Sequence, residues 1–169
     1  MLYNIKKFLV NCRIIRIFVS ENKTNKYNII MKKYRLTEER IKVNGATLYR
    51  IEALKDFSNV RKGDKGGFVQ SEANLSHDGK CWVYDNAKVF ENATVRGNAA
   101  VQGFAIVRGC SVVFGNATVR RRATVREFST VRGFAVVSGF AIVRGFAVVR
   151  GSGIVSGSRI VKGDTVVRE

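Results

Sequence analysis

The sequence predicts an all-β fold, in which most of the chain winds as a three-sided coil of short strands behind a small β-rich module. Two observations predict it. From Val83 onward a valine recurs at every sixth position, fifteen times without a miss. Two positions before each of these valines except Val161 lies a small residue, and two positions after most of them lies glycine. A period this regular indicates a solenoid, in which each repeat packs only against its neighbours.

The structure of one repeat follows from these residue types. In the pattern small-x-Val, the small residue and the valine point to one face and the middle residue points to the other. The glycine that follows tolerates the backbone angles of a turn. A short strand and a turn in every hexapeptide give a coil of three hexapeptides. Residues 83–169 therefore make about five coils, with valine filling the interior of each.

Residues 31–82 precede the repeats and contain patterns typical of short strands. Asn44 and Gly45 separate two of these patterns and predict a hairpin turn. Gly66 and Gly67 predict a break in the chain before the next strand. We expect this β-rich module to cap the first coil, whose unpaired strand edge would otherwise invite aggregation.

Residues 1–30 are predicted to be a loose extension of the fold. They contain a short apolar run from Phe8 to Val19, but Arg13 and Arg16 interrupt it and no cleavage site of a signal peptide follows. The run is also too short and too charged to span a bilayer. We expect native translation to begin at Met31.

The residues around the start of the repeats carry a resemblance to a known family. The segments that carry it are Lys33–Thr37, Thr47–Phe57, Gly63–Val69 and Ser71–His77, followed by Trp82 and Val83. They resemble the N-terminal module of YdcK-like proteins, which runs directly into hexapeptide repeats. The resemblance implies the left-handed parallel β-helix of the hexapeptide-repeat superfamily. Because that superfamily includes many acyltransferases, an acyl-CoA-dependent acyltransferase is an alternative function.

His77, the one histidine of the sequence, is a weak catalytic candidate. Hexapeptide acyltransferases use a histidine base in a cleft between subunits, and Asp78 could hold an imidazole at this place. However, His77 precedes the repeats, and no long loop interrupts them to cover a substrate. A histidine in a surface turn is therefore the favoured interpretation. One histidine without a Cys/His cluster also argues against a zinc site, so we predict neither metal nor cofactor.

A formal net charge of +17 favours anionic partners. The residue after each core valine points outward and is often basic. With three hexapeptides per coil, two sides carry stacks of such residues: Arg108, Arg126, Arg144 and Lys162 on one, and Arg132, Arg150 and Arg168 on another. They are candidates for non-specific binding of nucleic acid or another polyanion. The alternative is that the arginine stems shelter apolar surface while their charged ends stay in water.

Phenylalanines recur in the turns, and several outward positions are also apolar. The phenylalanines are Phe104, Phe128, Phe134, Phe140 and Phe146. So much exposed apolar area predicts burial by a partner subunit, hence a homo-oligomer. The leading interpretation is a non-catalytic, self-associating structural or interaction protein of the bacterial or phage cytoplasm, with no membrane span.

Overall fold

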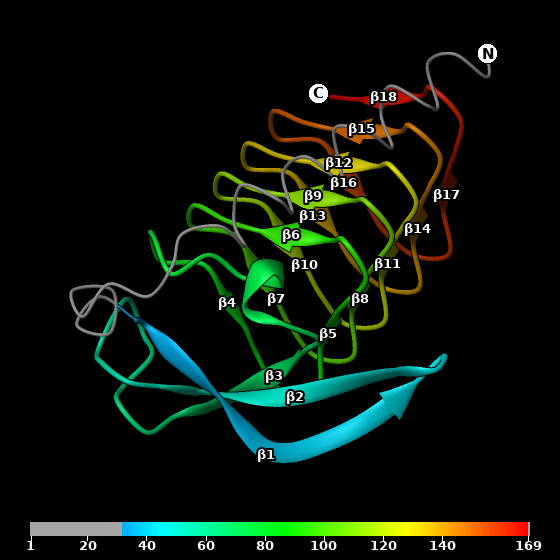
Figure 1. Ribbon diagram of the computed structural model, residues 1–169. Coiled ribbons are helices and arrows are strands. Elements are labelled where there is room, and N and C mark those ends of the chain that lie inside the picture. The colour runs from blue at the N-terminus through cyan, green and yellow to red at the C-terminus, as the bar shows by residue number, and fades with distance from the viewer. Residues whose placement is uncertain (1–31, 169) are drawn as a thin grey trace. The chain divides into compact units, whose positions relative to one another are not determined.

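The computed structural model describes residues 32–168, which contain eighteen strands and one 3-10 helix (Figure 1). Residues 33–168 belong to one compact unit. The predictions about residues 1–30 and about a start at Met31 concern residues outside the described part.

Three longer strands precede the repeats. β1 (Tyr34–Val43) and β2 (Ala46–Ala53) form an antiparallel hairpin, and β2 also pairs antiparallel with β3 (Lys65–Val69). The hairpin turns at Asn44 and Gly45, whose φ angles are 49° and 79°. Positive φ at both positions is the geometry that an Asn-Gly turn favours. The hairpin expected from these two residues is therefore present.

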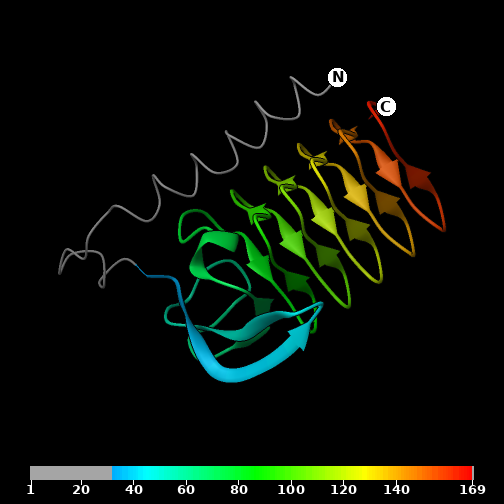
Figure 2. The ribbon, with the colours of Figure 1, turned by 45° about the vertical axis from the view of Figure 1, so that its right-hand side comes forward.

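Fifteen two-residue strands follow, and each ends at one of the periodic valines. They are β4 (Trp82–Val83), β5 (Lys88–Val89), β6 (Thr94–Val95), β7 (Ala100–Val101), β8 (Ile106–Val107), β9 (Val112–Val113), β10 (Thr118–Val119), β11 (Thr124–Val125), β12 (Thr130–Val131), β13 (Val136–Val137), β14 (Ile142–Val143), β15 (Val148–Val149), β16 (Ile154–Val155), β17 (Ile160–Val161) and β18 (Val166–Val167). Every third strand pairs in parallel, which gives three sheets around one interior. Figure 2 shows the coils stacked in succession toward the C-terminus.

The pairing register fixes the length of a coil. Val125 is the partner of Val107 in the preceding coil and of Val143 in the following one, so each coil takes three hexapeptides. The exposed fraction of the periodic valines is between 0% and 9%. They fill a continuous interior with the small residues that precede them. The predicted fold class, an all-β parallel β-helix with three hexapeptides per coil behind a β-rich cap, is confirmed.

The parallel stacking reaches back beyond Val83. Val69 in β3 pairs with Val89, and Leu75, after the 3-10 helix η1 (Glu72–Asn74), bridges to Val95. The partners in both pairs are further apart in the chain than partners in the regular coils, so one longer, irregular turn precedes those coils. β3 of the cap and β5 of the repeats belong to the same sheet, so the sheet continues across residue 82. The division of the chain into a cap and a β-helix at that residue stays a prediction.

The sequence led us to expect a break in the chain at Gly66 and Gly67. This prediction is wrong, because both glycines lie buried inside β3. A Cβ atom on Gly66 would lie 2.5 Å from the backbone oxygen of Val83, and one on Gly67 would lie 2.5 Å from that of Ala87. The two glycines therefore allow the strand to approach the next turn of the backbone closely. A Gly-Gly pair predicts a break and a close approach equally well.

Turns join the three sheets at three corners of the β-helix. The first corner contains the turns after β4, β7, β10, β13 and β16; the second follows β5, β8, β11, β14 and β17; the third follows β6, β9, β12, β15 and β18. Most turns place glycine at positive φ, but four place another residue there: Arg121 and the carboxylates Asp85, Glu91 and Glu127. Each carboxylate accepts a hydrogen bond of 2.7–2.8 Å from the amide of the glycine one coil later. This bond offsets part of the cost of the left-handed backbone.

Candidate functional site

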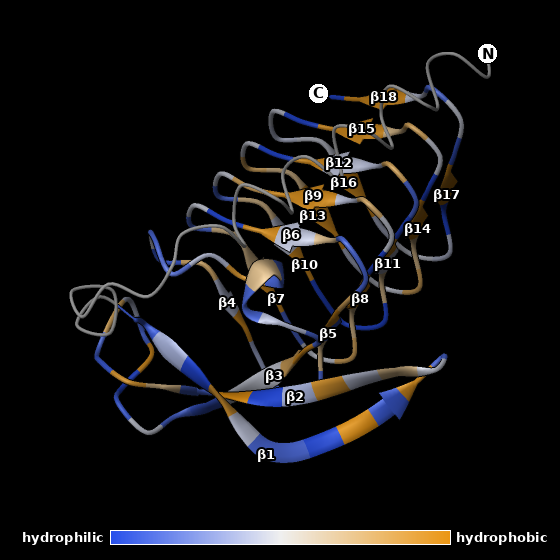
Figure 3. Ribbon diagram, in the orientation of Figure 1, coloured by the Kyte–Doolittle hydropathy of each residue, from blue (hydrophilic) through white to orange (hydrophobic). Residues whose placement is uncertain are grey.

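The seven basic candidates lie directly after core valines, in two columns. The second corner carries Arg108, Arg126, Arg144 and Lys162, and the third carries Arg132, Arg150 and Arg168. Parallel pairing places the members of a column on successive coils, about 4.8 Å apart. Figure 3 shows hydrophilic residues in many of the turns of the β-helix and mostly apolar residues on its short strands, whereas β1 is largely hydrophilic. The charge is therefore concentrated along the corners.

Part of this charge is compensated within the chain. At the second corner, Arg108 Nη1 lies 3.5 Å from a carboxylate oxygen of Glu91, and Arg126 Nε lies 3.7 Å from one of Glu127. At the third corner, the guanidinium of Arg96 lies 4.9 Å from the ring centroid of Phe114. The column at the second corner consequently attracts anions less than a count of its basic residues indicates.

The first corner carries a basic cluster whose main members were not among the predicted site residues. Arg120, Arg121 and Arg122 are consecutive and all exposed. Phe104 and Phe140 lie at the position of Arg122 one coil earlier and one coil later, and are 54% and 61% exposed. The guanidinium carbon of Arg122 lies 5.8 Å from the centroid of each ring. Aligning every third hexapeptide of the sequence would have found this alternation.

The five phenylalanines proposed for self-association do not form one surface. Phe104 and Phe140 lie at the first corner, Phe128 and Phe146 stack at 5.2 Å at the second, and Phe134 lies at the third. Phe134 is the most exposed of them, at 67%. A single interface cannot bury all five, because three corners of a triangular coil face different directions.

His77 lies in a bend between Leu75 and β4, outside the regular coils. Its ring stacks on Tyr34 with a centroid distance of 4.3 Å, and its Nδ1 accepts a hydrogen bond of 3.2 Å from the amide of Lys33. Its Nε2 lies 3.7 Å from a carboxylate oxygen of Glu72. The amide of Asp78 instead donates to Ser76 Oγ, so Glu72 takes the place that the sequence suggested for Asp78. These contacts anchor the start of β1 against the irregular turn.

A buried lysine and a buried thiol lie beside this histidine. Lys33 Nζ donates to the backbone oxygen of Cys81 at 2.8 Å and to that of Gly79 at 3.4 Å, and lies 3.4 Å from Cys81 Sγ. Burial lowers the pKa of Lys33 and raises the pKa of Cys81. A raised pKa keeps the thiol protonated at neutral pH, where it is a poor nucleophile. The pair therefore suits a structural role in closing the irregular turn.

Tyr34 is expected to make the unfolding free energy depend on pH in the alkaline range. Its hydroxyl donates to the backbone oxygen of Leu75 at 2.8 Å, and burial, assisted by the charge of Glu72, raises its pKa. An unfolded tyrosine ionises near pH 10, while the native one keeps its proton. The unfolding free energy should therefore fall above about pH 10, by up to about 1.4 kcal/mol per pH unit from this group.

Urea unfolding at a series of pH values above neutrality measures this effect. A Tyr34→Phe variant, which cannot ionise, should lose less stability than the wild type over the alkaline range. Equal slopes for the two proteins would contradict the assignment to Tyr34.

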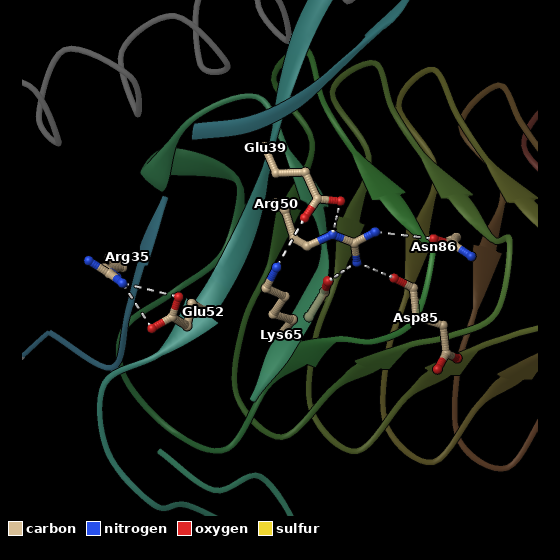
Figure 4. Close-up of polar contacts among 8 residues, drawn as sticks. Arg35, Glu39, Arg50, Glu52, Lys65, Asp85 and Asn86 are labelled. Atoms are coloured by element: carbon tan, nitrogen blue, oxygen red, sulfur yellow. Dashed lines mark hydrogen bonds and ion pairs between the residues drawn. The ribbon is translucent and has the colours of Figure 1, made fainter. Parts of the chain in front are cut away.

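Arg50 of β2 connects the hairpin to the first regular turn (Figure 4). Its Nη1 donates to the backbone oxygens of Gly66 at 2.7 Å and Asp85 at 3.2 Å. Its Nε pairs with Glu39 at 2.6 Å, and its guanidinium carbon lies 4.2 Å from the ring centroid of Phe68. With these partners, Arg50 serves to hold the hairpin in place rather than to bind an external anion.

Two further observations concern the part of the chain that the structure describes. No group of three His, Cys, Asp or Glu side chains there is placed to hold a metal ion. Among residues 32–168, no helix combines the length and the apolar character that crossing a membrane requires.

No family model matches this sequence. The chain is similar to the protein named uncharacterized acetyltransferase YdcK of Escherichia coli (strain K12), with 36% identity over 63 residues. The match covers 32% of this chain and 19% of that protein, so it spans about a fifth of the relative's length. Together, this similarity and the stacked coils fit a β-helix of the hexapeptide-repeat kind.

Proposed function

We propose that this chain is a non-catalytic interaction protein, a β-helix whose basic corners bind an anionic polymer. The observation that carries the proposal is the register of three hexapeptides per coil, which repeats a positive charge about every 4.8 Å along a corner. Like charges at this distance repel by about 1 kcal/mol even in water. A polyanion relieves this repulsion, and its binding is favoured further by the release of counterions.

The non-catalytic part of the proposal is supported by the surroundings of the candidate groups. The Nδ1 of His77 accepts a backbone hydrogen bond and its ring is stacked, which leaves it poorly placed to act as a base. The thiol of Cys81 is buried and its pKa is raised. The regular coils from Val83 onward keep one turn length throughout, with no inserted loop to enclose a substrate.

Salt-dependent binding to heparin and to a labelled DNA duplex tests the proposal. We expect binding at low salt, and a triple variant Arg132→Gln, Arg144→Gln and Arg150→Gln should reduce the slope of log K against log salt by about 2 to 3. A matched control with the same charge change replaces three arginines of the cap, Arg35, Arg40 and Arg61. An absence of binding to both probes at low salt, or an equal loss in the control, would refute the proposal.

Self-association is a second proposal, which the exposure of Phe134 at 67% and Ile154 at 60% favours. The net charge of +17 opposes contact between copies, so we expect oligomers to grow in population as salt screens the repulsion. Sedimentation velocity at low and high salt measures this. One monomeric species under both conditions would contradict it.

An acyltransferase is the rival proposal, supported by the partial similarity to a protein whose name includes acetyltransferase. Thiol release from acetyl-CoA in the presence of candidate amine acceptors is the assay, with His77→Ala as the decisive variant. An activity that His77→Ala abolishes, in a protein that still folds, would replace the non-catalytic proposal.

A further inference from the structure

We infer that the first corner of the β-helix is a binding platform for single-stranded nucleic acid. The platform consists of Arg120, Arg121 and Arg122 with Phe104 and Phe140 on the two neighbouring coils. The inference rests on the proposed binding of polyanions, and adds the chemical class of the ligand and the place where it binds.

The charge of this corner is uncompensated. Among residues 32–168, no carboxylate forms an ion pair with any of the three arginines. At the second corner, by contrast, Arg108 and Arg126 each have a glutamate partner. Three full positive charges on consecutive exposed residues make the first corner a stronger attractor of phosphates than the second corner.

The two aromatic rings add a feature that simple charge attraction does not need. Phe104 and Phe140 are 54% and 61% exposed, although burial of each ring would be favourable. Arg122 lies between them, with 5.8 Å from its guanidinium carbon to each centroid. The parallel register separates the two rings by two coils, about 10 Å along the axis, so neither ring covers the other. A flat apolar ligand can therefore stack on each ring.

The backbone beneath the platform is held in place by hydrogen bonds between coils. The amides of Phe104, Arg122 and Phe140 donate to the backbone oxygens of Arg121, Gly139 and Gly157, at 2.7, 2.9 and 2.8 Å. Because the turns are already ordered, binding loses little backbone entropy, and the rings keep their spacing. Exposed aromatics interleaved with cations on a fixed frame are the features that bind single strands without sequence preference.

A single strand fits this chemistry better than a duplex or a sulfated polysaccharide. The bases of a duplex are already stacked on one another, and a polysaccharide has no aromatic faces. Both ligands can use the arginines, but of the three only an unpaired base offers the rings a flat aromatic face. We therefore predict that the protein prefers a single strand to a duplex, and that this preference depends on Phe104 and Phe140. The charge-dependent binding that all three ligands share should not depend on the two rings.

The test compares an oligothymidine with a DNA duplex of equal length by fluorescence anisotropy at several salt concentrations. The wild type should bind the single strand more tightly than the duplex. The double variant Phe104→Leu, Phe140→Leu keeps apolar bulk but lacks aromatic faces, and should weaken single-strand binding by about tenfold to a hundredfold. Its affinity for the duplex and for heparin should not change. Phe134→Leu, an exposed phenylalanine at the third corner, is the matched control and should leave the preference intact.

The arginines have a separate test. Arg120→Gln, Arg121→Gln and Arg122→Gln together should weaken binding of both nucleic acids and lower the slope of log K against log salt for the single strand by about 2. The inference is wrong if the double leucine variant binds oligothymidine as tightly as the wild type does, or if the wild type does not prefer oligothymidine to the duplex. In either case, binding to heparin would still support the proposed function. If heparin and duplex fail to bind but oligothymidine does, the general proposal is wrong and the platform remains.

Discussion

Replacing Val125 with aspartate is expected to unfold the β-helix. Val125 lies at the centre of the stack, 0% exposed, between Val107 and Val143 of the neighbouring coils. A carboxylate there would lie unpaired in an apolar interior, at a cost of about 5 kcal/mol or more. The whole stability of a domain is only about 5–15 kcal/mol. Far-UV circular dichroism and the urea unfolding midpoint measure the loss.

The matched control changes the preceding residue of the same strand. Thr124 points outward, half-buried, beside Ile106 and Ile142. Thr124→Asp should cost only about 1 kcal/mol, the range of strand propensities. Equal effects of the two substitutions would mean that the valines do not form the interior, and the fold would be wrong.

The Gly66→Ala variant should lose about 3 kcal/mol of stability, because β3 packs too closely on its neighbours for a methyl group. The added Cβ would lie 2.5 Å from the backbone oxygen of Val83 and 2.7 Å from side-chain atoms of both Ile51 and Trp82. The backbone oxygen cannot move without shifting the first coil. We expect hydrogen exchange to accelerate in β1, β2 and β3, while β8, β11 and β14 keep their protection.

Gly63→Ala is the control for the change of residue type. Gly63 has a φ of 91° but nothing within 4 Å of the added Cβ atom. Its substitution should cost about 1–2 kcal/mol, from the left-handed backbone alone. If Gly66→Ala is no more destabilising than Gly63→Ala in urea unfolding, β3 has room for a methyl group and does not pack closely on the first coil.

The regular coils could be predicted in full from the sequence, because one short-range pattern repeats in them. The hexapeptide period predicted the strands, the buried valines and the pairing register, since each of these depends only on position within a unit. The same period places Phe104, Arg122 and Phe140 in one column. The prediction treated the basic residues after the valines and the phenylalanines of the turns as two separate sets. It therefore named Phe104 and Phe140 but missed Arg122, which shares their column.

The irregular first turn could not be predicted in the same way. Val69 and Leu75 are one hexapeptide apart, which was an available signal, but Val83 follows Leu75 at a longer spacing. The extra residues between Leu75 and Val83 shift the hexapeptide register, so the period cannot be followed back from the regular coils. Contacts such as those of Arg50 with Asp85, or Lys33 with Cys81, join residues 35 and 48 positions apart and depend on where this turn places the chain. No local pattern encodes them.

The coil length also determines how the molecule could change size without losing its outer chemistry. Removing three consecutive hexapeptides deletes one layer and returns every later side chain to its former corner. Removing a single hexapeptide preserves the valine interior equally well, but turns everything downstream by a third of a revolution. An arginine from the second corner would then lie in the column of a different corner. The interior accepts any whole number of hexapeptides, whereas the pattern displayed to a partner survives only when they are gained or lost in threes.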